Sequence, residues 1–543
     1  LNARALRDAL TVLDPGGQVI LNLASRPGEA VLSRMFERRG YHHDVLWRAR
    51  IEQAEDTDIA PLVELERRAG QPFSFYLHRH SRESISAALA SLARTAKLPI
   101  YHELFVVEGR PQSEALLPLA LALESLQLSD LWERVDLSRA TDEQLRFVTV
   151  LAERFVHDPV APYPHEHGDL GFRQRVTGFL AKFHGVSLAA SEVFVGPSRA
   201  SLVFGALVAM VAPGDRVAVS HQLRPALAAA LAKHGAEVVW VHDDAAELAE
   251  LLPVLLPRLL IVAPTGATRH AADTWGRLLA QCQAHDVLLV LDDSGSFAIT
   301  ARPGENPMLA FLAEHPASAH LAVMIGLIHS QAFPEVELAL LLCRHHALLS
   351  ALGLTAEVTY SRISVFHQAY YESLFDELLT FRVGAGWTSS VAGPSPRPGP
   401  RLMPQLAQIA KLPVFARPEP APDVLRLDYG ENALPMPKSL VAGILEGFLL
   451  PPHTAGSALH ARDAAQRYLQ STSLPELTPE QVVLGQGVTP LLFDALLAET
   501  RRRGRPLRVG IARVGWPVVP AMLHALGATL CYLDVTAPGF QLD

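Results

Sequence analysis

Two stretches of the chain repeat the same order of predicted elements, and this repeat constrains the fold more than any other feature of the sequence. Residues 191–241 and residues 480–533 each predict a strand, a Gly-rich turn, a helix, a strand, a second helix, a Gly-Ala pair and another strand. A repeated supersecondary unit indicates that related modules follow one another in the chain. Strands that alternate with helices favour sheets with crossover connections. We therefore expect two α/β modules in tandem.

The first 84 residues also alternate between helix and strand. We expect helices at 1–13 and 28–40, a Pro-Gly turn at 14–17, and strands at 18–24, 41–51 and 71–79. This alternation predicts the back half of a doubly wound α/β domain. From residue 85 to residue 160 the apolar residues recur mainly with a helical period, which predicts a helical connector.

Composition sets the remaining boundaries. The first repeat copy belongs to an α/β region at 161–385, and the many prolines of 386–423 predict an extended linker after it. Residues 424–543 begin the second copy and stop in the middle of its pattern. The chain starts with Leu rather than Met, and its first helix lacks the character of a signal peptide. We therefore expect a segment of a longer polypeptide.

Charge, cysteine content and hydropathy argue against several classes of protein. A formal charge of −9 and a pI near 6.2 give no electrostatic reason to bind nucleic acid. The three cysteines are far apart, which argues against a disulfide framework or a thiolate zinc site and favours the cytoplasm. No apolar run reaches the roughly 18 residues of a membrane helix. The His-rich spots lack HExxH spacing, so we expect no metal site.

In both copies a Gly turn joins a strand to a helix, a place where N–H groups and a hydroxyl can hold a phosphate. In the first copy the turn reads Gly-Pro-Ser-Arg and offers the hydroxyl of Ser198, although Pro197 removes one N–H donor. In the second copy Gly487 and Thr489 are the candidates. Such a turn is more often simple topology than a phosphate site.

The order of landmarks in the first copy resembles the class I and II aminotransferases. After the turn come PGDRVAVS (213–220), LLIVAPTGAT (259–268), VLLVLDDSGSFAI (287–299) and GLIHSQAFPEVELALLLC (326–343). The resemblance implies a fold-type I α/β domain in which Asp292 pairs with the pyridinium nitrogen of pyridoxal phosphate (PLP). Gly295 and Ala263 stand where the family usually has a tyrosine and an asparagine.

The lysine that would hold PLP is missing from this copy. Ser330 matches the serine of the family's Ser-Lys motif, but Gln331 stands at the lysine position. A carboxamide cannot form a Schiff base, because its nitrogen lone pair is delocalised into the carbonyl. None of the chain's five lysines lies between 234 and 410. We expect no catalytic residue in this segment and no PLP within 161–385, whereas PLP stays possible in the second copy.

The remaining candidates have structural alternatives. Asp292 at a strand end can equally cap a helix or pair with an arginine. Ser198 and Ser330 are thus vestigial candidates for a cofactor site rather than assigned ligands. The lysine-less module could bind an amino acid without chemistry or serve as a scaffold, and the fold alone does not decide between these roles.

The order of all parts resembles the methionine S-methyltransferase family. Four stretches carry the resemblance: RPGEAVLSRMFERRGY (26–41), QAEDTDIAPLVELER (53–67), HQAYYESLFDELLTF (367–381) and LDYGENALPMP (427–437). The resemblance implies that residues 1–84 are the C-terminal part of a class I methyltransferase domain. It also implies that S-adenosylmethionine is bound mainly by residues upstream of Leu1. The implied reaction gives S-methylmethionine, with the aminotransferase-like domains in regulatory or scaffolding roles.

Methyl transfer between two sulfurs requires little acid–base chemistry. A thioether has no proton to lose, so the reaction depends on in-line alignment and on a pocket that tolerates a cation. Methionine is the expected small-molecule partner, and a homo-oligomer is expected by analogy with aminotransferases. The alternatives are a PLP-dependent aminotransferase that is active in the second copy and a non-catalytic amino-acid-binding module.

Overall fold

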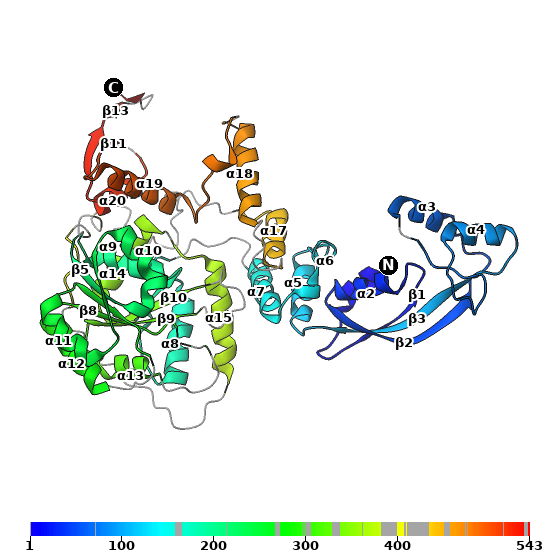
Figure 1. The fold of residues 1–543 in the computed structure, drawn as a ribbon, viewed down its shortest axis with the longest axis horizontal. Helices are drawn as coiled ribbons and strands as arrows, with labels where there is room; N and C mark the ends of the chain where they lie inside the picture. The colour runs from blue at the N-terminus through cyan, green and yellow to red at the C-terminus, as the bar shows by residue number, and fades with distance from the viewer. Residues whose placement is uncertain are drawn as a thin grey trace, which may run out of the picture. The chain divides into compact units, whose positions relative to one another are not determined.

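Internal contacts divide the computed structural model into two units, which we describe separately. Unit 1 consists of Leu1–Val160 and Ala433–Thr454, and unit 2 consists of Ala161–Asn432 and Ala455–Asp543 (Figure 1). The five-part division expected from the sequence remains a prediction. The structure describes residues 2–542, with these exceptions: 71, 158–164, 213, 266–271, 296, 298, 300–305, 328–336, 361, 382–398, 405, 407–408, 410–433, 450–456, 473, 475, 514 and 537–540.

Unit 1 is built on a three-stranded sheet of order β1-β3-β2. Strands β1 (Val19–Ala24) and β2 (Tyr41–Glu52) run in the same direction, and α2 (Glu29–Glu37) connects them as a crossover. Strand β3 (Tyr101–Pro111) lies between them and is antiparallel to both. The carboxyl ends of β1 and β2 therefore lie at the same edge of the sheet.

Close packing holds α2 and α1 (Asn2–Ala9) on this sheet. Phe36 of α2 is fully buried, and a Cβ on Gly109 of β3 would approach its ring to 2.8 Å. Only glycine at this position therefore lets the ring lie flat on the strand. The hydroxyl of Tyr41 donates a 2.8 Å hydrogen bond to the carbonyl of Leu6 and ties α1 to the start of β2.

The other helices of unit 1 form two groups. Helices α3 (Ala60–Ala69) and α4 (Ala87–Thr95) pack around a small apolar core that includes Phe75 and Ile100. The second group comprises α5 (Leu116–Ser125), α6 (Leu131–Arg134), the 3-10 turn Leu137–Arg139, α7 (Asp142–His157) and α17 (Lys438–Leu449). The rings of Phe147 on α7 and Phe448 on α17 lie 4.6 Å apart.

Two details of unit 1 differ from the sequence-based expectation. A strand was expected at 71–79, but the described residues of this stretch, 72–79, form only two isolated bridges, Phe75 with Ile85 and Tyr76 with Tyr101. The central strand β3 instead lies inside the stretch that was expected to be helical. Its sequence, YHELFVVEGRP, is rich in residues that favour strands, and the strong helical patterns on both sides of it hide this signal.

Unit 2 contains a seven-stranded mixed sheet of order β4-β10-β9-β8-β7-β5-β6. The strands are β4 (Val193–Gly196), β5 (Arg216–Ser220), β6 (Glu237–Val241), β7 (Leu259–Val262), β8 (Leu288–Asp292), β9 (Leu321–Gly326) and β10 (Ala339–Cys343). Only β10 is antiparallel to its neighbours. Every residue of β7 to β10 is buried, as expected for strands that are covered on both faces. The predicted α/β fold is therefore confirmed for this unit.

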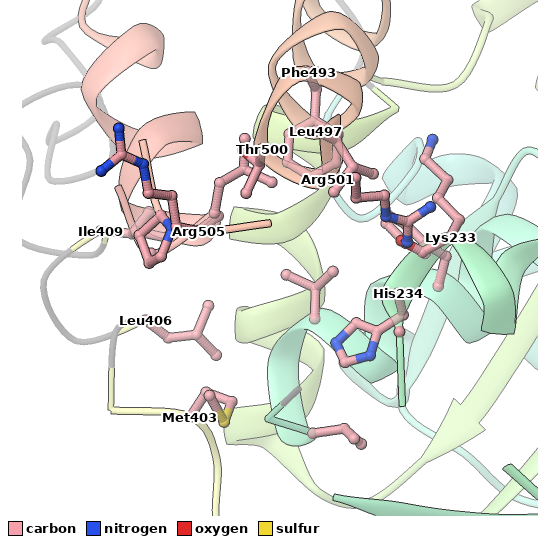
Figure 2. A pocket seen from close by; sticks show the side chains of 18 of the residues that line it. Lys233, His234, Met403, Leu406, Ile409, Phe493, Leu497, Thr500, Arg501 and Arg505 are labelled. Carbon is pink, nitrogen blue, oxygen red and sulfur yellow. The ribbon is translucent and has the colours of Figure 1, made fainter. Parts of the chain in front are cut away.

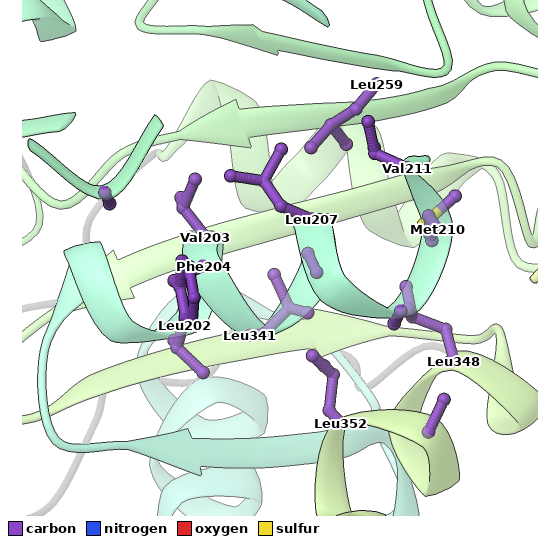
Figure 3. Packing of buried hydrophobic residues seen from close by; sticks show 14 of the residues in the cluster. Leu202, Val203, Phe204, Leu207, Met210, Val211, Leu259, Leu341, Leu348 and Leu352 are labelled. Carbon is purple, nitrogen blue, oxygen red and sulfur yellow. The ribbon is translucent and has the colours of Figure 1, made fainter. Parts of the chain in front are cut away.

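Helices cover both sides of the sheet (Figure 1). They are α8 (Leu170–His184), α9 (Arg199–Met210), α10 (Arg224–His234), α11 (Ala245–Leu255), α12 (Ala272–Ala284), α13 (Pro307–Glu314), α14 (His346–Thr359) and α15 (Val365–Thr380), with 3-10 turns at Ala190–Glu192 and His221–Leu223. Figure 3 shows α9 packing against the sheet and α14, with Leu207 and Leu341 among the buried contacts. Leu259 and Ile261 of β7 face this core, so Leu260 and Val262 face the helices on the other side.

The structure confirms the internal repeat. The second copy contains the 3-10 turn Pro479–Gln481, α19 (Val488–Arg503), β11 (Arg508–Ala512), α20 (Val518–Ala525) and β12 (Thr529–Leu533), after α18 (Ser457–Thr472) and before the short strands Val535–Thr536 and Gln541–Leu542. Val217 pairs with Val238 in the first copy and Val509 pairs with Leu530 in the second, a separation of 21 residues in both (238 − 217 and 530 − 509). The expected strand at 482–485 is not formed, since no strand pairs with it in the described part of the chain.

One glycine contact occurs at the same place in both copies. A Cβ on Gly196 would lie 2.4 Å from Leu202, and a Cβ on Gly485 would lie 2.7 Å from Leu491, six residues later in both cases (202 − 196 and 491 − 485). The leucine of the following helix thus folds back over the turn. This shared contact explains why each copy keeps a glycine at the end of its first segment.

We predict that Gly196→Ala and Gly485→Ala both lower the free energy of unfolding, by about 1–3 kcal/mol, because the added methyl group overpacks the leucine. The matched control is Gly276→Ala within α12, where a Cβ meets no atom within 4 Å. That change should stabilise the protein by about 0.5–1 kcal/mol. Denaturant unfolding of the three variants tests this, and equal effects at all three positions would contradict the proposed contact.

Candidate functional site

The first repeat copy brings a carboxylate and a guanidinium together where β4 and β8 end. Asp292 is the last residue of β8, and Arg199 is the first residue of α9, directly after the turn that follows β4. The Nη1 atom of Arg199 donates a 2.8 Å hydrogen bond to the hydroxyl of Ser294 and lies 3.6 Å from Oδ2 of Asp292. The candidate Asp292 is therefore paired with an arginine, which was one of the two structural alternatives.

Burial makes this ion pair important for stability. The side chain of Asp292 is 1% exposed, and its Oδ1 accepts hydrogen bonds from the backbone N–H of Ser294, at 3.0 Å, and from the Ser294 hydroxyl. Burial raises the pKa of Asp292 from its usual value, and the hydrogen bonds from Ser294 and the charge of Arg199 oppose that rise. Oδ2 is buried and has no hydrogen-bond partner. The guanidinium of Arg199 is thus the positive charge that pairs with the buried carboxylate of Asp292.

The position of Arg199 in its helix explains why it needs this partner. A positive side chain in the first turn of a helix is opposed by the partial positive charge of the helix N-terminus. Asp292 places a negative charge beside that N-terminus, which compensates for the charge of Arg199 and for the partial charge of the helix end. The arginine is visible in the Gly-Pro-Ser-Arg turn, but no local pattern indicates that it faces the aspartate of a strand ninety-three residues later (292 − 199).

Ser198 is used as a helix cap. Its hydroxyl accepts a 3.1 Å hydrogen bond from the backbone N–H of Ser201 and lies 3.0 Å from the Ser201 hydroxyl. A serine at this position typically stabilises a helix by about 1 kcal/mol. The phosphate-binding role that was expected for Ser198 is untested, and the hydroxyl already has a structural partner.

These residues do not fit PLP as a covalently held cofactor. The aspartate that would contact the pyridinium nitrogen is paired with Arg199, and the Ser198 hydroxyl caps α9. The backbone N–H of Ala263, at the position of the usual asparagine, donates a 3.0 Å hydrogen bond to Asp243. Gly295 is exposed and brings no side chain. Ser330 and Gln331 lie outside the described residues, so the argument from the missing lysine depends on the sequence alone.

In the second copy the equivalent helix begins differently. Gly487 precedes α19 with a φ of +102°, a conformation that favours glycine, and it provides no side-chain cap. Thr489 is 9% exposed. No hydrogen bond or ion pair joins either residue to Asp292 in the part of the chain that the structure describes. A role for Gly487 and Thr489 in cofactor binding remains a prediction.

A cavity of about 560 Å³ lies between the two copies (Figure 2). The C-terminal ends of α9 and α10 line one side, the C-terminal ends of α19 and α20 line another, and Met403, Leu406 and Ile409 contribute further apolar contacts. Phe204 and Phe493, each eight residues after its turn glycine (204 − 196 and 493 − 485), meet edge to face with ring centroids 6.2 Å apart. Equivalent positions of the repeat thus face each other.

Charged groups at the edge of this cavity join the two copies. Lys233 of α10 forms an ion pair with Asp494 of α19, and its ammonium lies 4.9 Å from the ring centroid of Phe204. Arg501 donates a 2.7 Å hydrogen bond to the carbonyl of Ala232. Because the cavity lies at the C-terminal end of α9, it is about 18 Å from the Asp292 pair at the other end of this twelve-residue helix.

His234 is a half-buried titratable group that lines this cavity. Burial lowers its pKa from 6.5 to about 4, and its Nδ1 atom has no hydrogen-bond partner. In Figure 2 its imidazole points from α10 toward the side of the cavity where Leu406 and Met403 lie. A neutral imidazole among apolar side chains is thus the state that the fold favours near neutral pH.

Within the described ranges, no three His, Cys, Asp or Glu side chains gather where they could hold a metal ion. No helix in the described residues is both long and apolar enough to cross a membrane.

We predict that Arg199→Ala lowers the free energy of unfolding by about 2–4 kcal/mol, because it leaves the Asp292 charge buried and unpaired. Adding Asp292→Asn should recover part of this loss, with a coupling energy of about 1–3 kcal/mol between the two positions. The matched control is Arg216→Ala, which removes an exposed ion pair with Glu237 and should change stability by less than about 1 kcal/mol. Additive effects of the two changes in a double-mutant cycle would contradict the pairing.

We predict that acid destabilises unit 2 between pH 6.5 and pH 4. Burial lowers the pKa of both His167 and His234 to about 4, whereas both titrate near 6.5 in the unfolded chain. The unfolded state therefore binds protons first, and the stabilisation present above pH 6.5 is lost as the pH falls. His234→Leu should reduce the slope of unfolding free energy against pH, measured with urea at pH 7, 6 and 5. An unchanged slope would show that His234 is accessible to protons in the folded state.

Comparison with known proteins places the chain among sequence relatives. No family model matches it. It is 26% identical to the methionine S-methyltransferase of Hordeum vulgare over 467 residues, which cover 83% of this chain and 43% of the relative. It is 25% identical to the enzyme of Arabidopsis thaliana over 476 residues, which cover 83% of this chain and 44% of the relative. It is 26% identical to the enzyme of Wollastonia biflora over 400 residues, which cover 70% of this chain and 37% of the relative. The chain thus spans less than half the length of these relatives.

Aminotransferases are among the solved structures that resemble the chain, with low TM-scores. A PLP-bound putative aminotransferase from Clostridium difficile 630 is 11% identical with a TM-score of 0.36, and covers 44% of this chain and 62% of its own. An aminotransferase from Mycobacterium tuberculosis is 21% identical with a TM-score of 0.35, and the match covers 43% of this chain and 65% of that protein. By its sequence, this chain is a relative of the methionine S-methyltransferases.

Proposed function

We propose that this protein transfers a methyl group from S-adenosylmethionine to methionine, giving S-methylmethionine, and that its aminotransferase-like part is regulatory or scaffolding. The observation that carries the proposal is the sequence similarity to methionine S-methyltransferases over 83% of the chain. Because the similar stretch is so long, the whole order of parts supports the relationship, rather than a single motif.

The topology of unit 1 supports the assignment of residues 1–84 to the end of a methyltransferase domain. Two parallel strands joined by a helical crossover are the building unit of doubly wound sheets, which bind their ligands at the carboxyl ends of the strands. Strand β3 would then belong to the same domain, so we extend the proposed domain to about Pro111. The connector would begin after that strand.

The proposed reaction depends on the positioning of the two substrates more than on proton transfer. The thioether of methionine attacks the sulfonium methyl in line, the bond to the leaving sulfur breaks, and the positive charge passes from one sulfur to the other. S-adenosylmethionine supplies the activated methyl group when it is bound. The residues of this chain would orient the acceptor and exclude competing nucleophiles.

The structure of the first repeat copy supports a role without PLP chemistry. An internal arginine pairs with the aspartate that the cofactor would need, and the hydroxyl of the turn serine caps a helix. We propose that this copy acts as a scaffold for the second copy, because the two pack through equivalent aromatic side chains. A cytoplasmic location and a homo-oligomer also remain proposals. PLP stays possible in the second copy.

We predict that the complete natural polypeptide, given S-adenosylmethionine and methionine, forms S-methylmethionine, measured by mass spectrometry. Gln331→Ala should leave kcat/KM within about twofold, because a carboxamide forms no aldimine. Borohydride treatment with PLP should give no covalent adduct within 161–385. Absence of methyl transfer would refute the proposed function, and an adduct in that region would favour the aminotransferase alternative.

A further inference from the structure

Arg26 is a half-buried cation that lacks an anionic partner. It follows the end of β1, and burial lowers its pKa from the usual value with no opposing contribution from a carboxylate. Its Nη2 atom donates a 2.6 Å hydrogen bond to Oε1 of Gln53, a neutral amide. Its Nε atom is buried without a hydrogen-bond partner, and no carboxylate lies within ion-pair distance in the described part of the chain.

Two other arginines provide an internal comparison. Burial also lowers the pKa of Arg173 and of Arg344. For Arg173, Asp169 and Glu166 oppose that shift, and for Arg344 it is Glu192, which lies 3.6 Å away. Arg173 and Arg344 are 6% and 5% exposed, more deeply buried than Arg26, and a carboxylate lies near each of them. Arg26 departs from that pattern.

Neutral polar groups surround Arg26 on one face of the sheet. The β1–β3 register ends where Ala24 pairs with Leu104, two residues before Arg26 and two residues after His102. His102 is 4% exposed, its Nδ1 has no hydrogen-bond partner, and burial followed by the charge of Arg26 lowers its pKa to about 4. Gln53 follows β2, and its Nε2 makes no hydrogen bond within the described structure. Arg26, His102 and Gln53 thus each keep a side-chain nitrogen without a hydrogen-bond partner in the described structure.

The position of this cluster suits a substrate. It lies at the carboxyl ends of β1 and β2, the edge where doubly wound sheets bind ligands. Desolvating a guanidinium without an anion is costly, and a carboxylate is the anion whose geometry fits its fork of donors. Since His102 is neutral, the cluster carries a single positive charge, which matches one carboxylate.

We propose that Arg26, supported by Gln53 and His102, binds the α-carboxylate of an amino-acid substrate. This inference depends on the proposed function, in which methionine and S-adenosylmethionine both carry such a carboxylate. Arg26 would fix the substrate by its acid end and leave the sulfur free to align. It is a specificity residue and takes no part in bond making.

The test uses the complete natural polypeptide and two methyl acceptors, methionine and 3-(methylthio)propylamine, which lacks the carboxylate. Arg26→Gln should raise the KM for methionine by about 10- to 100-fold, the effect of losing a charged hydrogen bond, with kcat little changed. The KM for the amine should not change. Arg26→Lys should restore part of the affinity. The control is Arg34→Gln, an exposed arginine on α2 without a hydrogen bond or ion pair in the described structure.

Each outcome decides between explanations. A rise in the KM for S-adenosylmethionine instead would assign the carboxylate to the methyl donor and keep the proposal. Equal losses for methionine and the amine, or unchanged KM values for both substrates, would overturn it, and a lowered melting temperature without a KM effect would identify a structural role.

If the wild-type protein transfers no methyl group, the proposed function fails separately. Calorimetry with methionine and with S-adenosylmethionine then tests the carboxylate site. Binding that Arg26→Gln abolishes would support the site. Unchanged binding, or no binding of either compound to the wild type, would refute it.

Discussion

The ion pair of Asp292 with Arg199 determines what the first repeat copy can do. It joins the end of a central strand to the start of the helix that packs across the sheet, and it places a negative charge beside the helix N-terminus. The same two charges would otherwise be the natural contacts for a cationic ring and an anionic phosphate. Once they satisfy each other inside the protein, neither charge is left to hold such a cofactor. The absence of a lysine at position 331 and the internal partner of Asp292 both disfavour a covalently held cofactor in this copy.

The repeat also shapes the packing of unit 2. Helix α19 of the second copy lies against the helices of the first, and the aromatic rings that meet, Phe204 and Phe493, occupy the same place in each copy. Related surfaces that meet through equivalent residues resemble the interface of a symmetric dimer built within one chain. The cavity beside these rings combines apolar walls with a neutral imidazole. Neither the resemblance to aminotransferases nor the similarity to methionine S-methyltransferases suggests a ligand for this cavity.

Much of the fold could be predicted from the sequence, because the repeat and the alternation of strands and helices are local patterns. The order of elements in both copies, and the buried strands of the large sheet, follow from them. Strand β3 was missed since its partners are distant in sequence and its neighbours are strongly helical. At the candidate site, the sequence pointed to Asp292 and left its partner open. The pairing with Arg199 and the isolation of Arg26 are properties of three-dimensional neighbours, which no local pattern records.

The late position of β3 in the chain has a consequence for how unit 1 folds. Strands β1 and β2 leave a gap between them, and the strand that fills it is made about fifty residues after β2 ends (101 − 52). During synthesis both strands must therefore wait with unpaired edges facing each other, and the contacts that close the sheet are distant in sequence and slow to form. Such an interval exposes the growing chain to wrong strand pairing and aggregation.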